Sequence, residues 1–364
     1  MDNNAFAVIM AGGRGERFWP ESRIAHPKQL LRLLDGITMI EQTVRRIAPL
    51  FPPERIVIAT NERYVPAMRA LFADIPPENI LGEPAARNTA PCIAMAAAYV
   101  GTLAKDRDPV IAVFPSDHAI QDAASFRSVV ADCTAFARSR ECIVTIGIAP
   151  TFPATGYGYI QTGARLDFPA DSVFFNAVAF REKPDPETAK AYLESGNFRW
   201  NGGMFFFSAG TLMNAFALHA PFLADFCNTA AGAFRARDNA ALAAAYCSVQ
   251  KISIDYAIME KAHNVVVAEA SFDWDDVGSW TSLRNQIPPD ENRNVVRARH
   301  AGIDTGDCIV FSDDDSHLIA TAGLHDTIVV HTADATLVCS DSYAQKIGQL
   351  LKLMDADPDL KKYL

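Results

Sequence analysis

The chain has 364 residues, of which 49% are hydrophobic and 21% are charged, and its formal net charge is −10. This length suits two domains, or one large domain with an appendage. The acidic balance argues against a general nucleic-acid binder and against a protein that binds anionic membranes. No apolar run reaches the ~20 residues that span a bilayer, and the seven cysteines are scattered without metal-ligand spacing. We therefore expect a cytoplasmic protein with reduced thiols and with no nucleic-acid or membrane partner.

The first part of the chain alternates short apolar runs, rich in Val and Ile, with helix-like segments. The predicted strands are 6–10, 55–59, 110–114 and 142–147, and the predicted helices are 39–48, 64–72, 90–103 and 125–137. Nearly continuous hydrophobicity is typical of strands that are buried on both faces of a sheet. This order of elements predicts a doubly wound α/β sheet that binds its ligands at the carboxyl ends of the strands.

The pattern changes twice further along the chain. Residues 151–207 predict a β-rich insertion that covers the substrate, with strands at 156–162, 172–181 and 203–207 and with helices following at 211–226 and 255–261. From Pro288 onward, short β-like runs at 308–311, 318–320, 327–331 and 335–339 are separated by Gly, Asp and Ser turns. This spacing predicts a β-roll or a few coils of a β-helix, closed by a helix at 342–354. We therefore divide the chain into a catalytic domain, 1–287, and a small β-rich domain, 288–364.

A glycine-rich turn directly follows the first predicted strand and is the strongest local signal. Its sequence is Ala11-Gly12-Gly13-Arg14-Gly15-Glu16-Arg17, and Lys28 follows it. Glycines let the backbone approach an anion with its N–H groups, and arginines add charge-assisted hydrogen bonds to phosphate. The turn is not a P-loop, because the Gly-Lys-Ser/Thr ending is missing. A tight turn with solvated arginines is the alternative, but three bases together favour a cradle for a triphosphate.

This segment, through Phe18-Trp19-Pro20 and Pro27-Lys28-Gln29, resembles the signature of the sugar-1-phosphate nucleotidylyltransferases. The Phe-Trp-Pro variant resembles the mannose-1-phosphate guanylyltransferase branch of that family. Further motifs follow in the family's order: Glu83-Pro84 with Arg87-Asn88-Thr89-Ala90-Pro91, Pro115-Ser116-Asp117-His118, Thr155-Gly156-Tyr157-Gly158-Tyr159-Ile160, Phe180-Arg181-Glu182-Lys183-Pro184, Trp200-Asn201-Gly202-Gly203-Met204-Phe205 and Asp273-Trp274-Asp275-Asp276-Val277-Gly278-Ser279-Trp280. The resemblance implies a Rossmann-like mixed sheet of the nucleotide-diphospho-sugar transferase type with the small β-rich domain appended.

The resemblance also implies a reaction and a set of site residues. The reaction is the transfer of GMP from GTP to mannose 1-phosphate, which gives GDP-mannose and pyrophosphate with Mg²⁺ as the cofactor. The implied catalytic residues are Arg14, Arg17, Lys28 and Lys183. The implied nucleotide-binding residues are Gly12, Gly13, Gly15, Glu83, Asn88 and Thr89. The implied sugar-binding residues are Gly156, Tyr157, Glu182 and Asn201, and the implied metal ligands are Asp117 and Asp276.

Several of these residues have a simpler local interpretation. Asp117 ends a predicted buried strand, where a carboxylate suits Mg²⁺, but it could also be the N-cap of the next helix. Asn88 or Thr89 could likewise cap the apolar helix that follows them. Glu182 and Lys183 could form a surface charge pair before a proline turn. The family resemblance favours the functional role in each case.

The sequence lacks a Ser/His/Asp relay, so a hydrolase is not supported. A sugar 1-phosphate is itself an ionised nucleophile, so the enzyme contributes positioning and charge neutralisation rather than a general base. The alternatives are the same reaction with another sugar or nucleotide, and a catalytically silent protein that senses nucleotide sugars. A β-rich C-terminal part often packs on a neighbouring copy, so a homodimer is a further hypothesis.

Overall fold

The computed structural model describes residues 4–34, 36–104 and 108–364. They form two compact units, each made of more than one stretch of chain. The first unit comprises Met1–Gly12, Arg45–Pro115 and Ile120–Asp273, and the second comprises Gly13–Val44, Ser116–Ala119 and Trp274–Leu364. Among the described helices, none combines the length and the apolar character that crossing a membrane requires.

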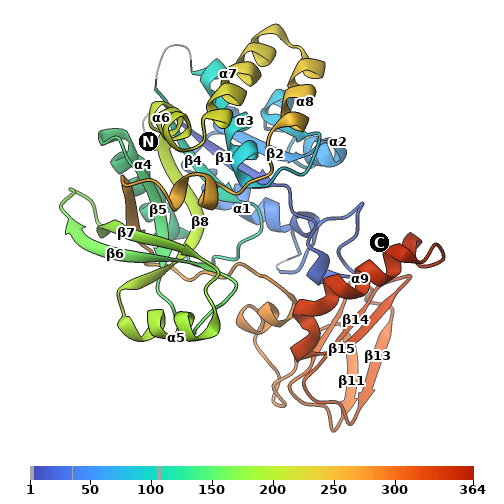
Figure 1. Cartoon of the computed structure of the whole chain (residues 1–364). Helices are drawn as coiled ribbons and strands as arrows, with labels where there is room; N and C mark the ends of the chain where they lie inside the picture. Colours follow the sequence, from blue (N-terminus) through green and yellow to red (C-terminus); the bar gives the residue numbers. More distant parts are fainter. Residues whose placement is uncertain (1–3, 35, 105–107) are drawn as a thin grey trace. The chain divides into compact units, whose positions relative to one another are not determined.

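The first unit is built on one mixed sheet with the strand order β3-β2-β1-β4-β8-β5-β9-β7-β6 (Figure 1). The strands are β1 Ala5–Ala11, β2 Ile56–Asn61, β3 Ile80–Glu83, β4 Val110–Pro115, β5 Ile143–Ile148, β6 Gly158–Leu166, β7 Phe174–Glu182, β8 Phe198–Ser208 and β9 Val265–Glu269. The first four pair in parallel, whereas β8 runs antiparallel to both β4 and β5. The predicted doubly wound mixed α/β sheet is confirmed.

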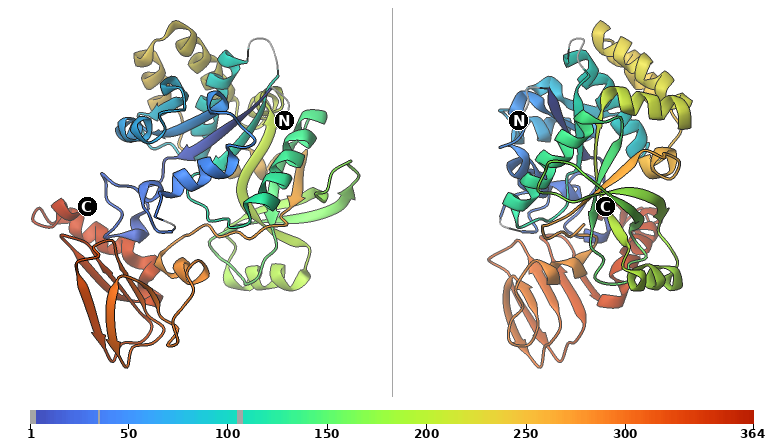
Figure 2. Two further views of the ribbon diagram at one scale, coloured as in Figure 1. Left: turned by 180° about the vertical axis from the view of Figure 1, so that it is seen from behind. Right: turned by 90° about the vertical axis from the view of Figure 1, so that its left-hand side faces the viewer.

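Helices cover both faces of this sheet (Figure 2). The helices of the first unit are α2 Val65–Leu71, α3 Thr89–Leu103, α4 Ala123–Ser139, α5 Pro186–Ser195, α6 Ala209–His219, α7 Pro221–Ala236 and α8 Asn239–Ser248, and α1 Met39–Ile47 runs from the second unit into the first. Of these, α7 packs on α3, and α8 packs on α7. Side chains alternate along β8, so Phe205 and Phe207 join the core with α3 and α6, whereas Phe206 packs through Phe114 toward Phe126 of α4. The helix α3 packs on both the sheet and α7, which explains why it is apolar all round.

Three sequence predictions need correction in this unit. The helix predicted at 211–226 is two helices, because Pro221 has no N–H to continue α6 and instead starts α7 at its first position. The segment predicted as a helix at 255–261 is a short π-helix, Asp255–Met259. The strands assigned to a separate insertion belong to the main sheet, since β8 lies between β4 and β5 and β6 forms the edge.

The second unit contains the predicted β-helix-like coils (Figure 2). The strands β10 Val295–Arg297, β12 Ile309–Ser312 and β14 Thr327–His331 stack in parallel, and β11 Arg299–Ile303 pairs in parallel with β13 Leu318–Ala322. The strand β15 Thr336–Ser340 pairs antiparallel with β14, and a 3₁₀ turn, Asp341–Lys346, leads into α9 Ile347–Ala356. The expectation of a small C-terminal β-roll or β-helix is therefore confirmed.

Trp280 lies at the centre of the core of the second unit. Its ring meets the ring of Phe18 edge to face, with centroids 5.2 Å apart, and the ring of Phe311 at 5.0 Å. Its Nε1 donates a hydrogen bond of 3.1 Å to the carbonyl of Trp19. One core thus joins the loop after β1, the segment after Asp273 and the β-helix coils.

We expect Trp280→Ala to lower the free energy of unfolding by ~3–5 kcal/mol, because it empties the centre of this core and leaves the Trp19 carbonyl without its donor. Chemical denaturation followed by circular dichroism measures the change. Val338→Ala is the control, since Val338 is 61% exposed on β15 and should change the stability by less than ~0.5 kcal/mol. Equal stability of Trp280→Ala and the parent would contradict the proposed role of this core.

Candidate active site

The glycine-rich turn forms an exposed loop directly after β1. Gly15 adopts a left-handed conformation, with φ 67°, and a Cβ there would overlap the Cβ of Lys28. Only glycine therefore fits position 15. A Cβ on Gly13, in contrast, would meet no atom within 4 Å. The loop leaves open space beside Gly13 and exposes Arg14.

Lys28 is buried, and its ammonium group joins the two predicted metal ligands. Its Nζ lies 2.7 Å from Oδ2 of Asp117 and also donates to the main-chain carbonyls of Asp276, at 2.9 Å, and Asp117, at 3.3 Å. An ammonium has three N–H donors, so each donor has an acceptor in this arrangement. The structure thus brings Lys28, Asp117 and Asp276 together from three separate parts of the sequence.

Asp117 is held in its ionised form. Burial raises the pKa of its carboxyl group, but the Lys28 ammonium, the His118 ring and the hydrogen bond from Lys28 outweigh burial and lower the pKa overall. Asp117 is not the N-cap of α4, because Asp122 occupies that position and accepts from the backbone N–H of Ser125. The capping alternative for Asp117 is therefore wrong.

The segment that carries Asp276 is strained and firmly supported. Val277 has φ 46°, which is rare for a β-branched residue and costs energy. Its N–H donates to Oδ1 of Asp275 at 2.6 Å, and Nδ2 of Asn285 donates to Oδ2 of the same carboxylate at 2.7 Å. The backbone of Asp275 also pairs with that of Ala119, beside the Asp117 segment. Asp275 therefore has a structural role here.

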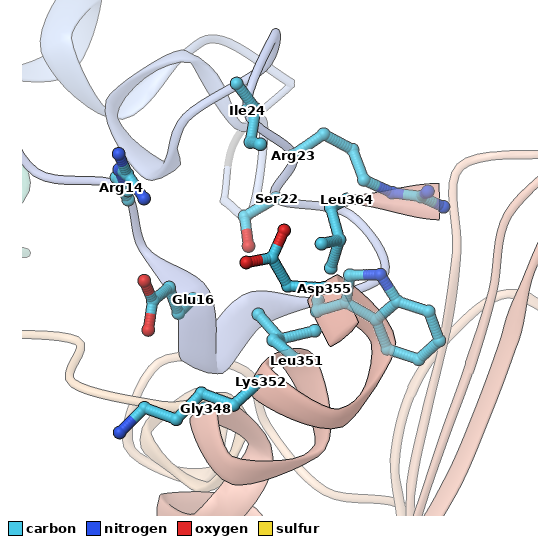
Figure 3. Close-up of a pocket in the computed structure, with 11 residues that line it drawn as sticks. Arg14, Glu16, Ser22, Arg23, Ile24, Gly348, Leu351, Lys352, Asp355 and Leu364 are labelled. Atoms are coloured by element: carbon cyan, nitrogen blue, oxygen red, sulfur yellow. The ribbon is translucent and has the colours of Figure 1, made fainter. Parts of the chain in front are cut away.

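Arg17 has a partner from the end of the chain. Its Nη1 donates to Oε1 of Gln345 at 2.7 Å, and Nε2 of Gln345 donates to the hydroxyl of Ser279 at 3.2 Å. Sequence reasoning missed Gln345, because it lies outside every motif. Arg14 instead lines a cavity of about 210 Å³ between the loop and α9, together with Glu16, Leu351, Lys352 and Asp355 (Figure 3).

In the first unit, Glu83 lies against the start of the glycine-rich loop. A Cβ on Gly12 would lie 2.8 Å from Oε2 of Glu83. The Tyr246 hydroxyl donates to Oε1, and the Cys92 thiol also bonds to this carboxylate. Burial raises the pKa of Glu83, and these two hydrogen bonds offset the effect only in part. Neither Tyr246 nor Cys92 stands out in the sequence.

In the segment after Glu83, the side chains of Asn88 and Thr89 both form hydrogen bonds within the protein. Asn88 has φ 71° and is the N-cap of α3, where its Oδ1 accepts from the N–H of Thr89. The capping role considered for Asn88 is confirmed. The hydroxyl of Thr89 accepts from the N–H of Ile254 at 2.9 Å. Thr89 therefore holds the residue that precedes the π-helix.

Two of the predicted sugar residues, Glu182 and Asn201, lie next to Gly158, where β6 begins. Gly158 pairs with Glu182, and a Cβ on it would lie 2.5 Å from Oε2 of Glu182 and 3.4 Å from Cβ of Asn201. Nζ of Lys183 lies 3.2 Å from Oε1 of Glu182, and the backbone N–H of Lys183 donates to the carbonyl of Tyr157 at 3.2 Å. Lys183 has φ 48°.

Gly156 does not join this group through any close approach. It is exposed, and a Cβ on it would meet nothing within 4 Å. The ring of Tyr157 packs edge to face against the ring of Trp200, with centroids 5.1 Å apart. The structure thus brings Glu182, Lys183 and Asn201 together and leaves Gly156 at the surface.

Three of the residues with a strained backbone conformation lie at or next to predicted site residues. Among the described non-glycine residues, three with positive φ angles are Asn88, Lys183 and Val277. The others are Arg237, which is the C-cap of α7, and Arg293, Asp304, Asp307 and Asp326. The last four fall before or between the strands of the β-helix part. Strained conformations persist where surrounding contacts enforce them, and they cluster at functional sites. Each of the first three is a predicted site residue or directly follows one.

Comparison with known proteins identifies the family. Residues 6–293 match the family model described as nucleotidyl transferase. This chain belongs to the nucleotidyl transferase family. Residues 298–354 match a second model, the MannoseP isomerase/GMP-like beta-helix domain. The family resemblance seen in the sequence motifs is confirmed.

Named relatives agree with this assignment. The chain is 36% identical, over 97% of its length, to a mannose-1-phosphate guanylyltransferase of Escherichia coli, of which it covers 74%. It is 39% identical, over 96% of its length, to the xanthan biosynthesis protein XanB of Xanthomonas campestris, of which it covers 73%. A crystal structure from Thermus thermophilus, described as mannose-1-phosphate geranyltransferase, matches with a TM-score of 0.86 and 34% identity over 97% of this chain and 99% of that chain.

We expect Gln345→Ala to lower kcat/KM of nucleotidyl transfer ~3- to 10-fold, because Arg17 loses the acceptor that fixes its guanidinium. Gln345→Glu keeps an acceptor for Arg17 and should recover most of the activity. Tyr343→Ala is the control, since Tyr343 lies in the same 3₁₀ turn and is 56% exposed. Parental turnover by Gln345→Ala, at an unchanged melting temperature, would overturn this positioning role.

Proposed function

We propose that this chain transfers GMP from GTP to mannose 1-phosphate, which gives GDP-mannose and pyrophosphate. One observation carries the proposal: the Lys28 ammonium joins the Asp117 carboxylate to the Asp276 segment. A cationic group between two acidic segments beside a glycine-rich loop suits phosphate chemistry. The choice of GTP and mannose 1-phosphate is supported by the guanylyltransferase name of the Escherichia coli relative, of which the chain covers 74%.

The family's chemistry uses a divalent metal ion, and we propose Mg²⁺ held by Asp117 and Asp276. Their carboxylates are hard oxygen donors, and Mg²⁺ binds one or two carboxylates together with substrate phosphates. Among the described residues, no three His, Cys, Asp or Glu side chains gather into a larger metal-binding group. When bound, the ion would neutralise the charge that develops on the reacting phosphates.

The residues of the chain position the two substrates for in-line attack. An oxygen of the sugar phosphate forms a new bond to the α-phosphorus of GTP. The bond from that phosphorus to the α,β-bridging oxygen breaks, and pyrophosphate leaves. The N–H groups of Gly12, Gly13 and Gly15, with Arg14, Arg17 and Lys28, stabilise the departing phosphates. Lys183, whose side chain is 61% exposed, holds the incoming phosphate.

The remaining predicted residues divide between the nucleotide and the sugar. Glu83, Asn88 and Thr89 serve the nucleotide, a role supported for Glu83 by its contact with Gly12. Glu182 and Asn201 serve the sugar hydroxyls, since carboxylate and amide groups suit such partners. Gly156 and Tyr157 face the sugar ring in this proposal.

We also propose the division at residue 288 and a homodimer. The division is supported by the two family models, which match residues 6–293 and 298–354. The compact units cut the chain elsewhere, because residues 13–44 pack in the same core as the C-terminal segment.

Purified protein with Mg²⁺ should release pyrophosphate fastest with GTP and mannose 1-phosphate, when tested against a panel of nucleoside triphosphates and hexose 1-phosphates. A coupled phosphate assay measures the rates, and chelation by EDTA should abolish them. A faster reaction with UTP or dTTP and glucose 1-phosphate would favour the other branch of the family. Tight binding of GDP-mannose without any turnover would favour a silent sensor.

Removing a cradle cation should slow the same reaction. We expect Arg14→Ala and Lys28→Ala each to lower kcat/KM at least ~10-fold, or about 1.4 kcal/mol of transition-state stabilisation. Arg235→Ala, which removes an arginine of α7 far along the chain from every motif, is the matched control and should behave as the parent. Near-normal turnover in both variants would show that Arg14 and Lys28 do not stabilise the triphosphate.

A further inference from the structure

One further carboxylate, that of Asp255, contacts Asn201, a sugar-binding residue of the proposed function. Asp255 is the first residue of the π-helix Asp255–Met259. Its Oδ1 accepts a hydrogen bond of 3.1 Å from Nδ2 of Asn201. Single π-helical turns are rare and occur often at functional sites, so this contact points to a specific role rather than to a generic helix start.

The hydrogen bonds of Asn201 fix the orientation of its amide. Oδ1 of Asn201 accepts from the N–H of Gly203 at 3.1 Å, and the Thr145 hydroxyl lies 3.3 Å away from it. The N–H of Gly203 requires an oxygen acceptor, so the amide atom that faces Gly203 must be Oδ1. The Nδ2 atom then lies on the opposite side, toward Asp255. Asp255 accepts a hydrogen bond from one of the two N–H groups of Nδ2. The second N–H group is then available to a ligand. Without Asp255, nothing in the described part of the chain would hold this donor in place from that side.

Asp255 is itself held by the segment that serves the nucleotide. The N–H of Ile254 donates to the Thr89 hydroxyl at 2.9 Å. The N–H of Ile252 donates to the carbonyl of Arg87 at 3.2 Å, and the N–H of Ala90 donates to the carbonyl of Ile252 at 3.2 Å. Residues 252–255 therefore run from the nucleotide segment at 87–90 to the amide of Asn201.

The surroundings of Asp255 shift the pKa of its carboxyl group upward. The pKa of Asp255 is raised to about 6, because burial and the nearby Glu182 carboxylate outweigh the groups that lower it. Hydrogen bonds from its own backbone and from Ser253, and the Lys183 ammonium, act in the opposite direction. Asp255 is therefore ionised above pH ~6 and becomes protonated as the pH falls through this value.

We propose that Asp255 is a positioning residue of the sugar subsite, which fixes the Asn201 amide and thereby sets the affinity and selectivity for the hexose 1-phosphate. This inference rests on the proposed function. Sites that bind a hydroxyl through fixed polar partners reject analogues that lack it or present it differently. Asp255 supplies such fixation from outside the series of sequence motifs that marks the sugar site.

The test compares Asp255→Ala and Asp255→Asn with the parent chain, using mannose 1-phosphate, glucose 1-phosphate and GTP. Asp255→Ala should raise KM for mannose 1-phosphate at least ~10-fold, since one charged hydrogen bond to the amide is lost. KM for GTP should stay within about twofold, and the preference for mannose over glucose 1-phosphate should shrink. Tyr256→Ala is the control for the π-helix itself, because Tyr256 is its next residue and is 48% exposed.

Asp255→Asn keeps the shape and an acceptor for Asn201 but cannot ionise. Its KM for mannose 1-phosphate at a pH of about 7.5 should stay within ~3-fold of the parent. Between about pH 5 and 7 the KM of the parent should rise toward low pH by a factor of at most ~3, up to the value of Asp255→Asn, because protonation makes Asp255 neutral like asparagine. Asp255→Asn should lack this rise, and the titration of the substrate phosphate is common to both proteins. This profile decides the matter if Asp255→Ala does not fold.

The outcomes separate the two proposals. An unchanged KM for mannose 1-phosphate in Asp255→Ala overturns the positioning role, and so does an equal rise in KM for mannose 1-phosphate and GTP. If the parent chain turns over these substrates, the proposed function stands in either case. Identical pH profiles of the parent and Asp255→Asn also overturn it. If the parent itself releases no pyrophosphate with any pair, the proposed function fails, and the inference fails with it.

Discussion

The buried ammonium of Lys28 is the constraint on which the arrangement of Gly15, Asp117 and Asp276 in the second unit depends. A buried charge is costly unless hydrogen bonds and an opposite charge compensate it. Lys28 meets this requirement with the Asp117 carboxylate and with two main-chain carbonyls. The glycine at position 15 is needed because the Lys28 side chain lies where a Cβ would be. The loop, Asp117 and the Asp276 segment are thus positioned by one another, and a change at any of them disturbs the other two.

Backbone strain shows how firmly these residues are held. Val277 keeps an unfavourable φ because Asp275 binds its N–H while Asn285 and the Ala119 backbone fix Asp275. In the first unit, Lys183 keeps its positive φ next to Glu182, whose carboxylate fills the space that Gly158 leaves open. Strain of this kind persists only where the surroundings enforce it. It therefore holds in fixed positions the charged groups to which we assign the proposed phosphate chemistry.

The sequence predicted the features that local patterns encode. Buried parallel strands are apolar throughout, and the glycine-rich loop follows the first of them, so the sheet and the loop were accessible from the sequence. Contacts between distant residues were not. Tyr246 lies 163 residues from Glu83, Gln345 lies 328 residues from Arg17, and Asp255 lies 54 residues from Asn201. No periodicity or propensity links such pairs, because each depends on how the whole chain packs.

The β-helix part is more than an appendage, because it supports the glycine-rich loop. Glycines make the loop able to approach an anion, but they also give it many conformations in the absence of support. Support comes from Phe18 and Trp19, which pack with Trp280 and the β-helix strands in one core. Gln345, placed just after those strands, binds Arg17 directly. The β-helix part therefore has a physical role in this chain. Its residues restrict the conformations of a glycine-rich loop that is flexible by its own sequence.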